Sequence, residues 1–316
     1  MVSRGSVPPP SDAPARPPPA ARAGLFFCSL VALAAGSLAF ALPAGAALPG
    51  YEEAVLHADP YSFHRFDETE GPTAADISGN DRDGTYFGSP TFGIPGAGGP
   101  GTDNAVGFDG SSDYMTIPGA SGLCQLLANV TFETVLRTET DANSVVFGTW
   151  NSGTNMAVNL ELNRGLAGFH RFFLRNNSGH TLIGDFENSD LINGDYHHLM
   201  LAVDMSQERA DRIKVYLNGQ AHAVTMSSQT PTWLGDDMDN LNLGDFAFDF
   251  TVGARNLRGA LDRHLDGVID EFAIYDTTFT AADAAAHFAA IPEPGTLAMM
   301  GLMGATLLIR RRLQKK

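Results

Sequence analysis

Three observations predict that this chain folds as an all-β protein, an antiparallel β-sandwich. Its central part consists of many short segments in which apolar and polar residues alternate with the period of two that β-strands have. Gly, Asn and Asp, which favour tight turns, separate these segments. Only one segment of the central part carries a clear helix signal. Short alternating segments at regular turn spacing are typical of sandwiches and barrels.

The first 46 residues predict a signal peptide with an extended leader. Arg16 and Arg22 precede an apolar run at 25–42, and the small residues Ala44-Gly45-Ala46 follow it. A basic segment, an apolar segment and a small-residue cleavage site in this order direct a protein to export. We therefore expect the mature chain to begin near Ala47; an uncleaved N-terminal membrane anchor is the alternative.

Residues 47–290 are expected to form the folded domain. In residues 129–138, Val130, Phe132 and Leu136 fall on one face of a strand. In residues 212–224, Asn218-Gly219 separates two alternating runs, which is the strongest short-range signal for a β-hairpin. The other strand signals lie at 61–66, 105–110, 114–117, 144–150, 156–162, 168–176, 196–204, 250–255 and 267–275.

The helix signal ends this domain. Thr280 and Asp283 have the spacing of a capping box, and an Ala-rich segment follows to Ala290. The expected fold is thus a sandwich with a short C-terminal helix.

Charge is distributed unevenly along the chain. The whole sequence has 20 basic and 36 acidic residues, but between its two ends only 12 basic and 34 acidic residues remain, a net charge of −22. Such a charge repels nucleic acid and anionic membranes and favours divalent cations or neutral ligands, so we expect no nucleic-acid partner. Removal of the signal peptide would leave Cys124 as the only cysteine, which excludes an intramolecular disulfide.

Residues 291–316 have a composition unlike that of the domain. Pro292-Glu293-Pro294 precede 15 largely apolar residues at 295–309. A helix of that length spans about 22 Å, short of the ~30 Å hydrocarbon core of a bilayer, although basic residues can reach the interface at its end. Arg310, Arg311 and Arg312 follow and would stay on the cytoplasmic side.

This tail resembles the PEP-CTERM sorting signal of exosortase-processed bacterial proteins. The matching features are Pro292-Glu293-Pro294, Gly295-Thr296, the apolar run with its transmembrane helix at 295–309, and Arg310-Arg311-Arg312. The resemblance implies export, anchoring in the membrane through the C-terminal helix before processing, cleavage by an exosortase, and delivery to the cell surface or extracellular matrix. A plain membrane anchor is the alternative.

The domain itself resembles the LamG-like jelly rolls of the concanavalin A-like group. The resemblance rests on "DPYSFHRFDETEGPTAADISGNDRDGTY", "AVGFDGSSDYMTIPG", "YHHLMLAVD", "IKVYLNGQ" and "LDGVIDEFAIYDTTFTAADAAAHF", which together span about 54–288. It implies a jelly-roll sandwich. His64 departs from the family pattern, because the family usually has Trp there.

An acidic loop is the candidate metal site. Asp76, Asn80 and Asp83 gather oxygen ligands, which Ca²⁺ prefers, in one glycine-containing loop. The family resemblance implies that Asp270 could add a carboxylate. The alternative is an ordinary turn in which Asp and Asn side chains accept bonds from their own backbone. A bound Ca²⁺ would brace the loop against the last strand rather than catalyse a reaction.

Catalytic patterns are weak. Period two places Val268 and Asp270 on one face of the last strand and Glu271 on the other, so the strand offers no obvious carboxylate pair for glycoside hydrolysis. His197 and His198 point to opposite faces, and we expect one to be buried and the other exposed. No nucleophile elbow, phosphate loop or paired Cys motif occurs.

We therefore expect a non-catalytic, exported binding protein of the cell surface or extracellular matrix, with a glycan or another envelope component as its ligand. Trp150 and Trp233 are candidates for stacking on sugar rings, although each could equally be a core or loop anchor. The alternatives are an exported glycoside hydrolase of the concanavalin A-like group and a purely structural matrix protein.

Overall fold

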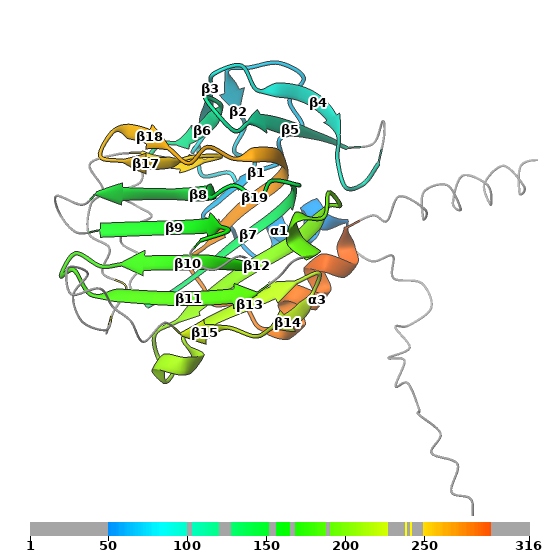
Figure 1. Ribbon diagram of the computed structural model, residues 1–316. Helices are drawn as coiled ribbons and strands as arrows, with labels where there is room; N and C mark the ends of the chain where they lie inside the picture. The colour runs from blue at the N-terminus through cyan, green and yellow to red at the C-terminus, as the bar shows by residue number, and fades with distance from the viewer. Residues whose placement is uncertain are drawn as a thin grey trace, which may run out of the picture. The chain divides into compact units, whose positions relative to one another are not determined.

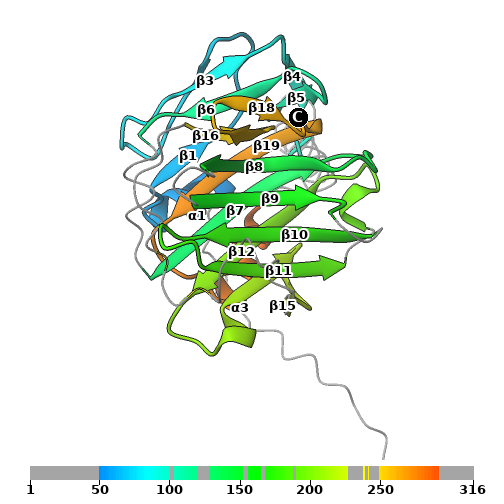
Figure 2. The same cartoon turned by 60° about the vertical axis from the view of Figure 1, so that its left-hand side comes forward.

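The chain folds into two β-sheets packed face to face, as the computed structural model in Figures 1 and 2 shows. The structure describes residues 50–99, 103–119, 128–151, 156–164, 168–187, 190–226, 238, 241 and 249–291. Within these ranges the fold is the predicted all-β antiparallel sandwich with a short C-terminal helix.

The smaller sheet has eight strands in the order β14-β13-β12-β7-β19-β5-β4, with β1 paired to β19. Its long central strands, β7 and β19, lie antiparallel to each other. The bounds are β1 Ser62–His64, β4 Thr91–Pro95, β5 Asn104–Asp109, β7 Asn129–Arg137, β12 His197–Asp204, β13 Ile213–Leu217, β14 Gln220–His222 and β19 Asp266–Tyr275.

The larger sheet has eleven strands, with β15-β11-β10-β9-β8-β16-β6-β3-β2 as its main order. Strand β17 pairs with β18 and, in parallel, with β8; the other described strand pairs are antiparallel. The bounds are β2 Thr73–Ala74, β3 Gly84–Phe87, β6 Tyr114–Ile117, β8 Ser144–Asn151, β9 Met156–Leu162, β10 Phe169–Arg175, β11 Thr181–Glu187, β15 Thr225–Met226, β16 Phe250–Val252, β17 Arg255–Leu257 and β18 Ala260–Asp262.

The main core fills the space between the sheets. Phe132 of the smaller sheet stacks on Phe147 and Phe250 of the larger one, with ring centroids 4.8 and 6.2 Å apart. Each of these rings is at most 2% exposed. Burying a side chain of this kind contributes about 1.5–3 kcal/mol, so the aromatic stack is a major source of stability.

A second apolar layer covers the outer face of the smaller sheet. Helices α1 (Tyr51–His57) and α3 (Ala281–Ala290) both lie there, in contact with each other. Val55 of α1 and Ala284 of α3 pack with Met200 and Ala273 of the sheet. Two 3-10 turns, η1 (Asp190–Ile192) and η2 (Arg209–Asp211), complete the described elements.

The structure confirms most of the predicted elements. The hairpin at Asn218-Gly219 connects β13 and β14, with φ of 49° and 72° at the two turn residues. The capping box of α3 is formed by Thr280 and Asp283. The sequence interpretation missed α1 and the strands β2, β3, β4, β11, β15 and β18.

No helix among the described residues is long and apolar enough to cross a membrane. The predicted helix at 295–309 and the signal peptide lie outside the described residues.

Candidate functional site

An irregularity in β19 brings two carboxylates of neighbouring residues together. In the pairing of β19 with β7, Ile269 is opposite Leu136 and Glu271 is opposite Val135, so Asp270 is an additional residue in a β-bulge. A bulge places two residues of one strand opposite one residue of the other and interrupts the alternation of faces. The prediction that Asp270 and Glu271 lie on opposite faces is therefore wrong.

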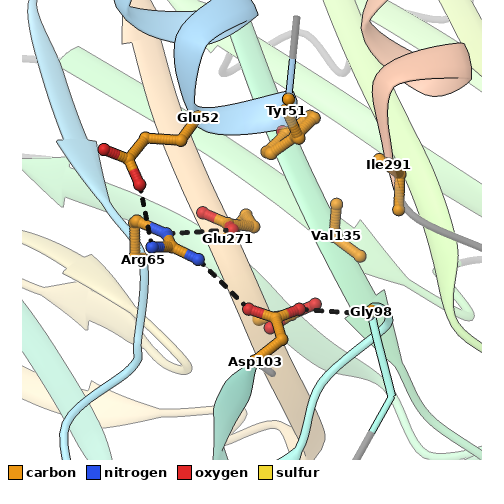
Figure 3. Close-up of a pocket in the computed structure, with 10 residues that line it drawn as sticks. Tyr51, Glu52, Arg65, Gly98, Asp103, Val135, Glu271 and Ile291 are labelled. Atoms are coloured by element: carbon orange, nitrogen blue, oxygen red, sulfur yellow. Dashed lines mark hydrogen bonds and ion pairs between the residues drawn. The ribbon is translucent and has the colours of Figure 1, made fainter. Parts of the chain in front are cut away.

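The two carboxylates share a pocket with Asp103, which precedes β5. Oxygen atoms of Asp103, Asp270 and Glu271 lie within 4.8 Å of one another. Asp270 is 1% and Glu271 4% exposed. They line a cavity of about 250 Å³ that Figure 3 shows between α1, β7 and β19, with Tyr51 and Val135 on its apolar side. We call this site the acidic pocket.

Arg65 closes one side of the acidic pocket. Its Nη1 lies 2.9 Å from Glu52 and its Nη2 3.2 Å from Asp103 Oδ1 (Figure 3). Its Nε is 3.5 Å from Glu271 Oε1. A further carboxylate, Asp67, lies 2.9 Å from Nη1. The single positive charge of Arg65 therefore faces four carboxylates, and it cannot balance the negative charge of all four.

Backbone groups hold the two aspartates. Ala97 N donates to Asp270 Oδ2 at 2.8 Å, and Gly98 N donates to Asp103 Oδ2 at 3.1 Å. Asp270 Oδ1 and Glu271 Oε2 are buried and have no hydrogen-bond partner in the described structure. Burial raises the pKa of Asp270, and so does the charge of Asp103. Burial and the charge of Asp270 raise the pKa of Glu271.

A second buried carboxylate, Glu133 of β7, joins four elements on the same sheet face. Its oxygens accept hydrogen bonds from Tyr51 at 3.0 Å and Tyr275 at 2.5 Å. His198 Nε2 lies 2.6 Å and His287 Nδ1 3.0 Å from it. Burial alone would raise the pKa of Glu133, but the hydrogen bonds from the two histidines lower it. This cluster attaches both helices to the sheet.

The predicted calcium loop contains side chains that bond their own backbone. Asp76 Oδ1 accepts from Phe63 N and Ser78 N at 2.9 and 3.0 Å, and its Oδ2 accepts from Arg82 N at 2.9 Å. Asp83 Oδ1 accepts from Asp76 N at 2.9 Å. Asn80 Nδ2 donates to the carbonyl of Pro60 at 3.0 Å. These are the bonds of the turn that was the alternative to a calcium site.

The structure corrects the expected grouping of these ligands. Among the described residues, Asp103, Asp270 and Glu271 are the one set of three His, Cys, Asp or Glu side chains whose ligand atoms lie within 4.8 Å of one another. Asp270 therefore belongs with Asp103 and Glu271, and it does not form such a set with Asp76 and Asp83. Sequence reasoning missed Asp103 and Arg65, because their positions in the chain give no sign that they meet β19.

The histidine pair also differs from its prediction. His197 is 7% and His198 1% exposed, so both are buried. His197 contacts Asn193 and Asn218 at 2.9 and 3.0 Å, whereas His198 contacts Glu133. The expectation that one of the two is exposed was wrong because the long loop before β12 and the hairpin turn both pack on His197.

The outer face of the larger sheet carries aromatic and charged side chains. Trp150 is half-buried, stacks on Phe173 with ring centroids 5.2 Å apart, and has the Arg255 guanidinium 5.3 Å from its ring. Phe87 is 42% exposed and stacks on Tyr114 of the neighbouring strand at 4.9 Å. Trp233 and the predicted sorting residues Pro292, Glu293, Pro294, Arg310, Arg311 and Arg312 lie outside the described residues.

Solved structures with a similar fold include binding domains of botulinum neurotoxins and of a mosquitocidal protein. The receptor-binding domain of botulinum neurotoxin C/D mosaic serotype has a TM-score of 0.52 and 10% identity over 74% of this chain and 52% of that chain. A structure of botulinum neurotoxin type C, whose cell entry is dependent upon interaction with two ganglioside molecules, has a TM-score of 0.52 and 12% identity over 75% of this chain and 52% of that chain.

The binding domain of Paraclostridial Mosquitocidal Protein 1 is also similar, with a TM-score of 0.50 and 11% identity over 72% of this chain and 51% of that one. This chain thus spans about half the length of these chains, and identities this low establish the fold alone. No functionally curated protein is detectably similar to this chain. Residues 109–285, more than half of the sequence, match the profile of the Concanavalin A-like lectin/glucanases superfamily, and the chain belongs to that family as a jelly-roll β-sandwich.

Proposed function

We propose that this chain is an exported, non-catalytic binding protein of the cell surface or extracellular matrix, and that its ligand is a carbohydrate. The proposal rests on the outer face of the larger sheet. Both described α-helices pack on the smaller sheet, so neither of them covers the outer face of the larger one (Figures 1 and 2).

The side chains of that face suit a glycan. Phe87 and Tyr114 form a stacked aromatic pair beside His264, and Trp150 lies further along the sheet. Aromatic rings pack against the apolar faces of sugars, while charged groups accept hydrogen bonds from sugar hydroxyls or donate hydrogen bonds to them. Arg171 and Asp185 provide such groups as a two-bond pair at 2.6 and 2.9 Å.

Burial of the carboxylates of β19 supports a non-catalytic function. A retaining glycosidase needs two carboxyl groups about 5–5.5 Å apart that both reach the anomeric carbon. Asp270 and Glu271 are close together, but they are 1% and 4% exposed, in a cavity smaller than the ~300–1,000 Å³ of typical ligand pockets. Such burial is poorly suited to a reaction in which both groups must reach one sugar ring.

Binding domains of toxins have a fold similar to that of this chain, which supports the proposal. Botulinum neurotoxin type C, which has a similar fold over 52% of its chain, depends for cell entry upon interaction with two ganglioside molecules, and this supports a search among glycans. The identity of 12% does not transfer a binding site, so the ligand must be found by experiment.

A glycan array tests the proposal. We expect saturable binding of the exported protein to one class of glycan, and a loss of at least tenfold, about 1.4 kcal/mol, in Phe87→Ala or Trp150→Ala. Phe288→Ala is the matched control, because Phe288 is 38% exposed but lies on α3. No saturable binding would favour a structural matrix protein, and product release from a polysaccharide would favour a hydrolase.

We also propose that the chain is sorted by an exosortase, on the basis of the tail sequence at 291–316. The mature protein should begin near Ala47 and lack the residues that follow the Pro292-Glu293-Pro294 region. Intact-mass measurement of protein from the cell surface tests both ends. Glu293→Ala should leave precursor in the membrane fraction. Surface protein that retains Arg310–Lys316 would contradict exosortase processing.

A further inference from the structure

We propose that the outer face of the larger sheet binds a glycan with negatively charged groups, carboxylate or sulfate, through a cluster of arginines. The inference rests on the glycan-binding function proposed above and names the class of glycan. We call the site the arginine cluster; it consists of Arg164, Arg171, Arg255 and Arg263 with the carboxylates of Glu161, Asp185 and Asp262.

Strand pairing places the arginine cluster on the outer face of the larger sheet. Both neighbours of Glu161 in β9 belong to the core between the sheets, so Glu161 points to the other side. Arg171 of β10 is opposite Glu161, and Asp185 of β11 is opposite Arg171. Arg255 of β17 lies on the same face, with its guanidinium 5.3 Å from the ring of Trp150. The charged groups thus form a row from β17 to β11 (Figure 1).

The centre of the arginine cluster is a buried carboxylate that three arginines share. Glu161 Oε2 lies 3.0 Å from Arg164 Nε. Glu161 Oε1 lies 2.7 Å from Arg263 Nη1 and 3.9 Å from Arg255 Nη1. Burial lowers the pKa of Arg263 and Glu161 raises it, but the charges of Arg255 and Arg164 lower it again. Three positive charges are therefore crowded around one negative charge.

The exposed part of the arginine cluster consists largely of guanidinium groups. The side chains of Arg164, Arg171 and Arg263 are 40, 25 and 21% exposed, whereas that of Glu161 is 3% exposed. Arg164 and Arg263 each use one nitrogen for Glu161, and within the described residues neither guanidinium has another acceptor. Their remaining N–H groups can bind a ligand, and a guanidinium binds oxygen anions with two parallel bonds.

The charge of the arginine cluster is opposite to that of the domain. The cluster holds four of the 12 basic residues between the two ends of the chain but only three of the 34 acidic ones, a net charge of +1. Among the ion pairs of Arg and Lys in the described ranges, it is the one group in which cations outnumber carboxylates. Because the acidic remainder repels an anion, an anionic ligand is directed to this cluster.

The length of the arginine cluster favours a polymer over a small anion. Neighbouring strands are ~4.8 Å apart, and three such steps lead from β10 through β9 and β8 to β17, about 14 Å in all. A single carboxylate or sulfate cannot reach both ends of such a row, whereas a glycan with a charge on repeated sugars can. Nucleic acid also carries repeated charges, but its dense phosphates would be repelled more strongly by the acidic domain.

Binding of the exported protein to immobilised polysaccharides tests the inference. The carboxylated probes are alginate and polygalacturonate, the sulfated probes are heparin and dextran sulfate, and the neutral probes are dextran and soluble starch. Single-stranded DNA is the control for general attraction to a polyanion. We expect saturable binding to a carboxylated or a sulfated probe, at least tenfold tighter than to either neutral probe or to DNA, and the two charged sets distinguish carboxylate from sulfate.

Variants locate the binding site. Arg164→Gln with Arg171→Gln should weaken binding to the acidic probe at least tenfold. Arg164→Gln alone leaves Glu161 two arginine partners, so it should fold and still bind more weakly than the wild type; Arg164→Lys, which keeps the charge, should lose less. Lys214→Gln is the matched control, because it removes a 45% exposed cation from β13 of the smaller sheet, and it should bind as the wild type does.

The outcomes separate this inference from the proposed function. If neutral polysaccharides bind best and the arginine variants bind as the wild type does, glycan binding stands and the charged ligand is wrong. If no polysaccharide binds, both are wrong. The inference is also overturned if DNA binds as tightly as the acidic probes, or if Lys214→Gln weakens binding as much as Arg164→Gln, because either result would show attraction to net charge and not to this cluster.

Discussion

At the scale of single residues, Glu133 links four elements of the fold through its hydrogen bonds. It is fully buried between α1, α3, β12 and β19, and it accepts bonds from a side chain of each. Removing one partner of a buried charged pair leaves the others without compensation. Glu133→Gln should therefore lower the free energy of unfolding by about 3 kcal/mol, which denaturant titration would measure.

The same cluster predicts how stability depends on pH. Burial lowers the pKa of His287, but the hydrogen bond and charge of Glu133 outweigh it and raise this pKa above the ordinary 6.5. Its contribution is thus complete below pH 6.5 and is lost as pH rises through the raised pKa. The pKa of Glu133 lies below the ordinary 4.5, so its contribution is present above pH 4.5 and is lost as pH falls through the lowered pKa.

The stability that Glu133 and His287 contribute together should therefore be greatest between about pH 4.5 and 6.5. Tyr51, His198, Tyr275 and Asp283 are the other titratable groups that face it. Melting curves of the wild type and His287→Gln between pH 4 and 9 test the prediction: the decline above pH 6.5 should be smaller in the variant. His57→Gln, at an exposed position, is the control. An unchanged decline in His287→Gln would contradict the assignment.

At the scale of elements, the sequence predicted those strands and turns that are determined locally. The Asn218-Gly219 turn needs positive φ at both positions, which these residues tolerate, and the structure has it there. A side chain at Gly219 would also come within 3.0 Å of Phe288 on α3, so the glycine permits close packing of the helix as well. Local turn chemistry and tertiary packing agree at this position.

The missed elements depend on contacts that are distant in sequence. Helix α1 has only seven residues, too short to be stable alone, and it is held by burial of Tyr51 and Val55 against the sheet. The bulge at Asp270 arises from the register between β19 and β7, which are separated by more than a hundred residues. Sequence alternation could not reveal it, and for that reason the acidic pocket could be recognised only in the structure.

At the scale of the whole molecule, charge and packing have opposite effects on the stability of the fold. The region between the two ends carries 34 acidic and 12 basic residues and a single cysteine, Cys124, so no disulfide can form within it. Stability therefore comes from the core between the sheets and from the layer beneath α1 and α3. The charge excess reduces that stability through repulsion among the carboxylates.

Salt should accordingly stabilise the protein in a buffer without divalent cations. Raising NaCl from 20 mM to 500 mM shortens the screening length from more than 10 Å to less than 8 Å, which weakens repulsion across the surface. Salt also weakens exposed ion pairs such as Lys214–Asp211, but each of these contributes only about 0–1 kcal/mol. With almost three acidic residues for each basic one, the loss of repulsion should dominate.

We therefore expect the melting temperature in EDTA to rise by about 2–4 °C, which corresponds to roughly 1 kcal/mol for a domain of this size. Choline chloride should have the same effect as NaCl, because screening depends on ionic strength and not on the cation. Scanning calorimetry in both salts measures the change. A lower melting temperature at high salt would show that attractive ion pairs, including those of Arg65, contribute more than repulsion does.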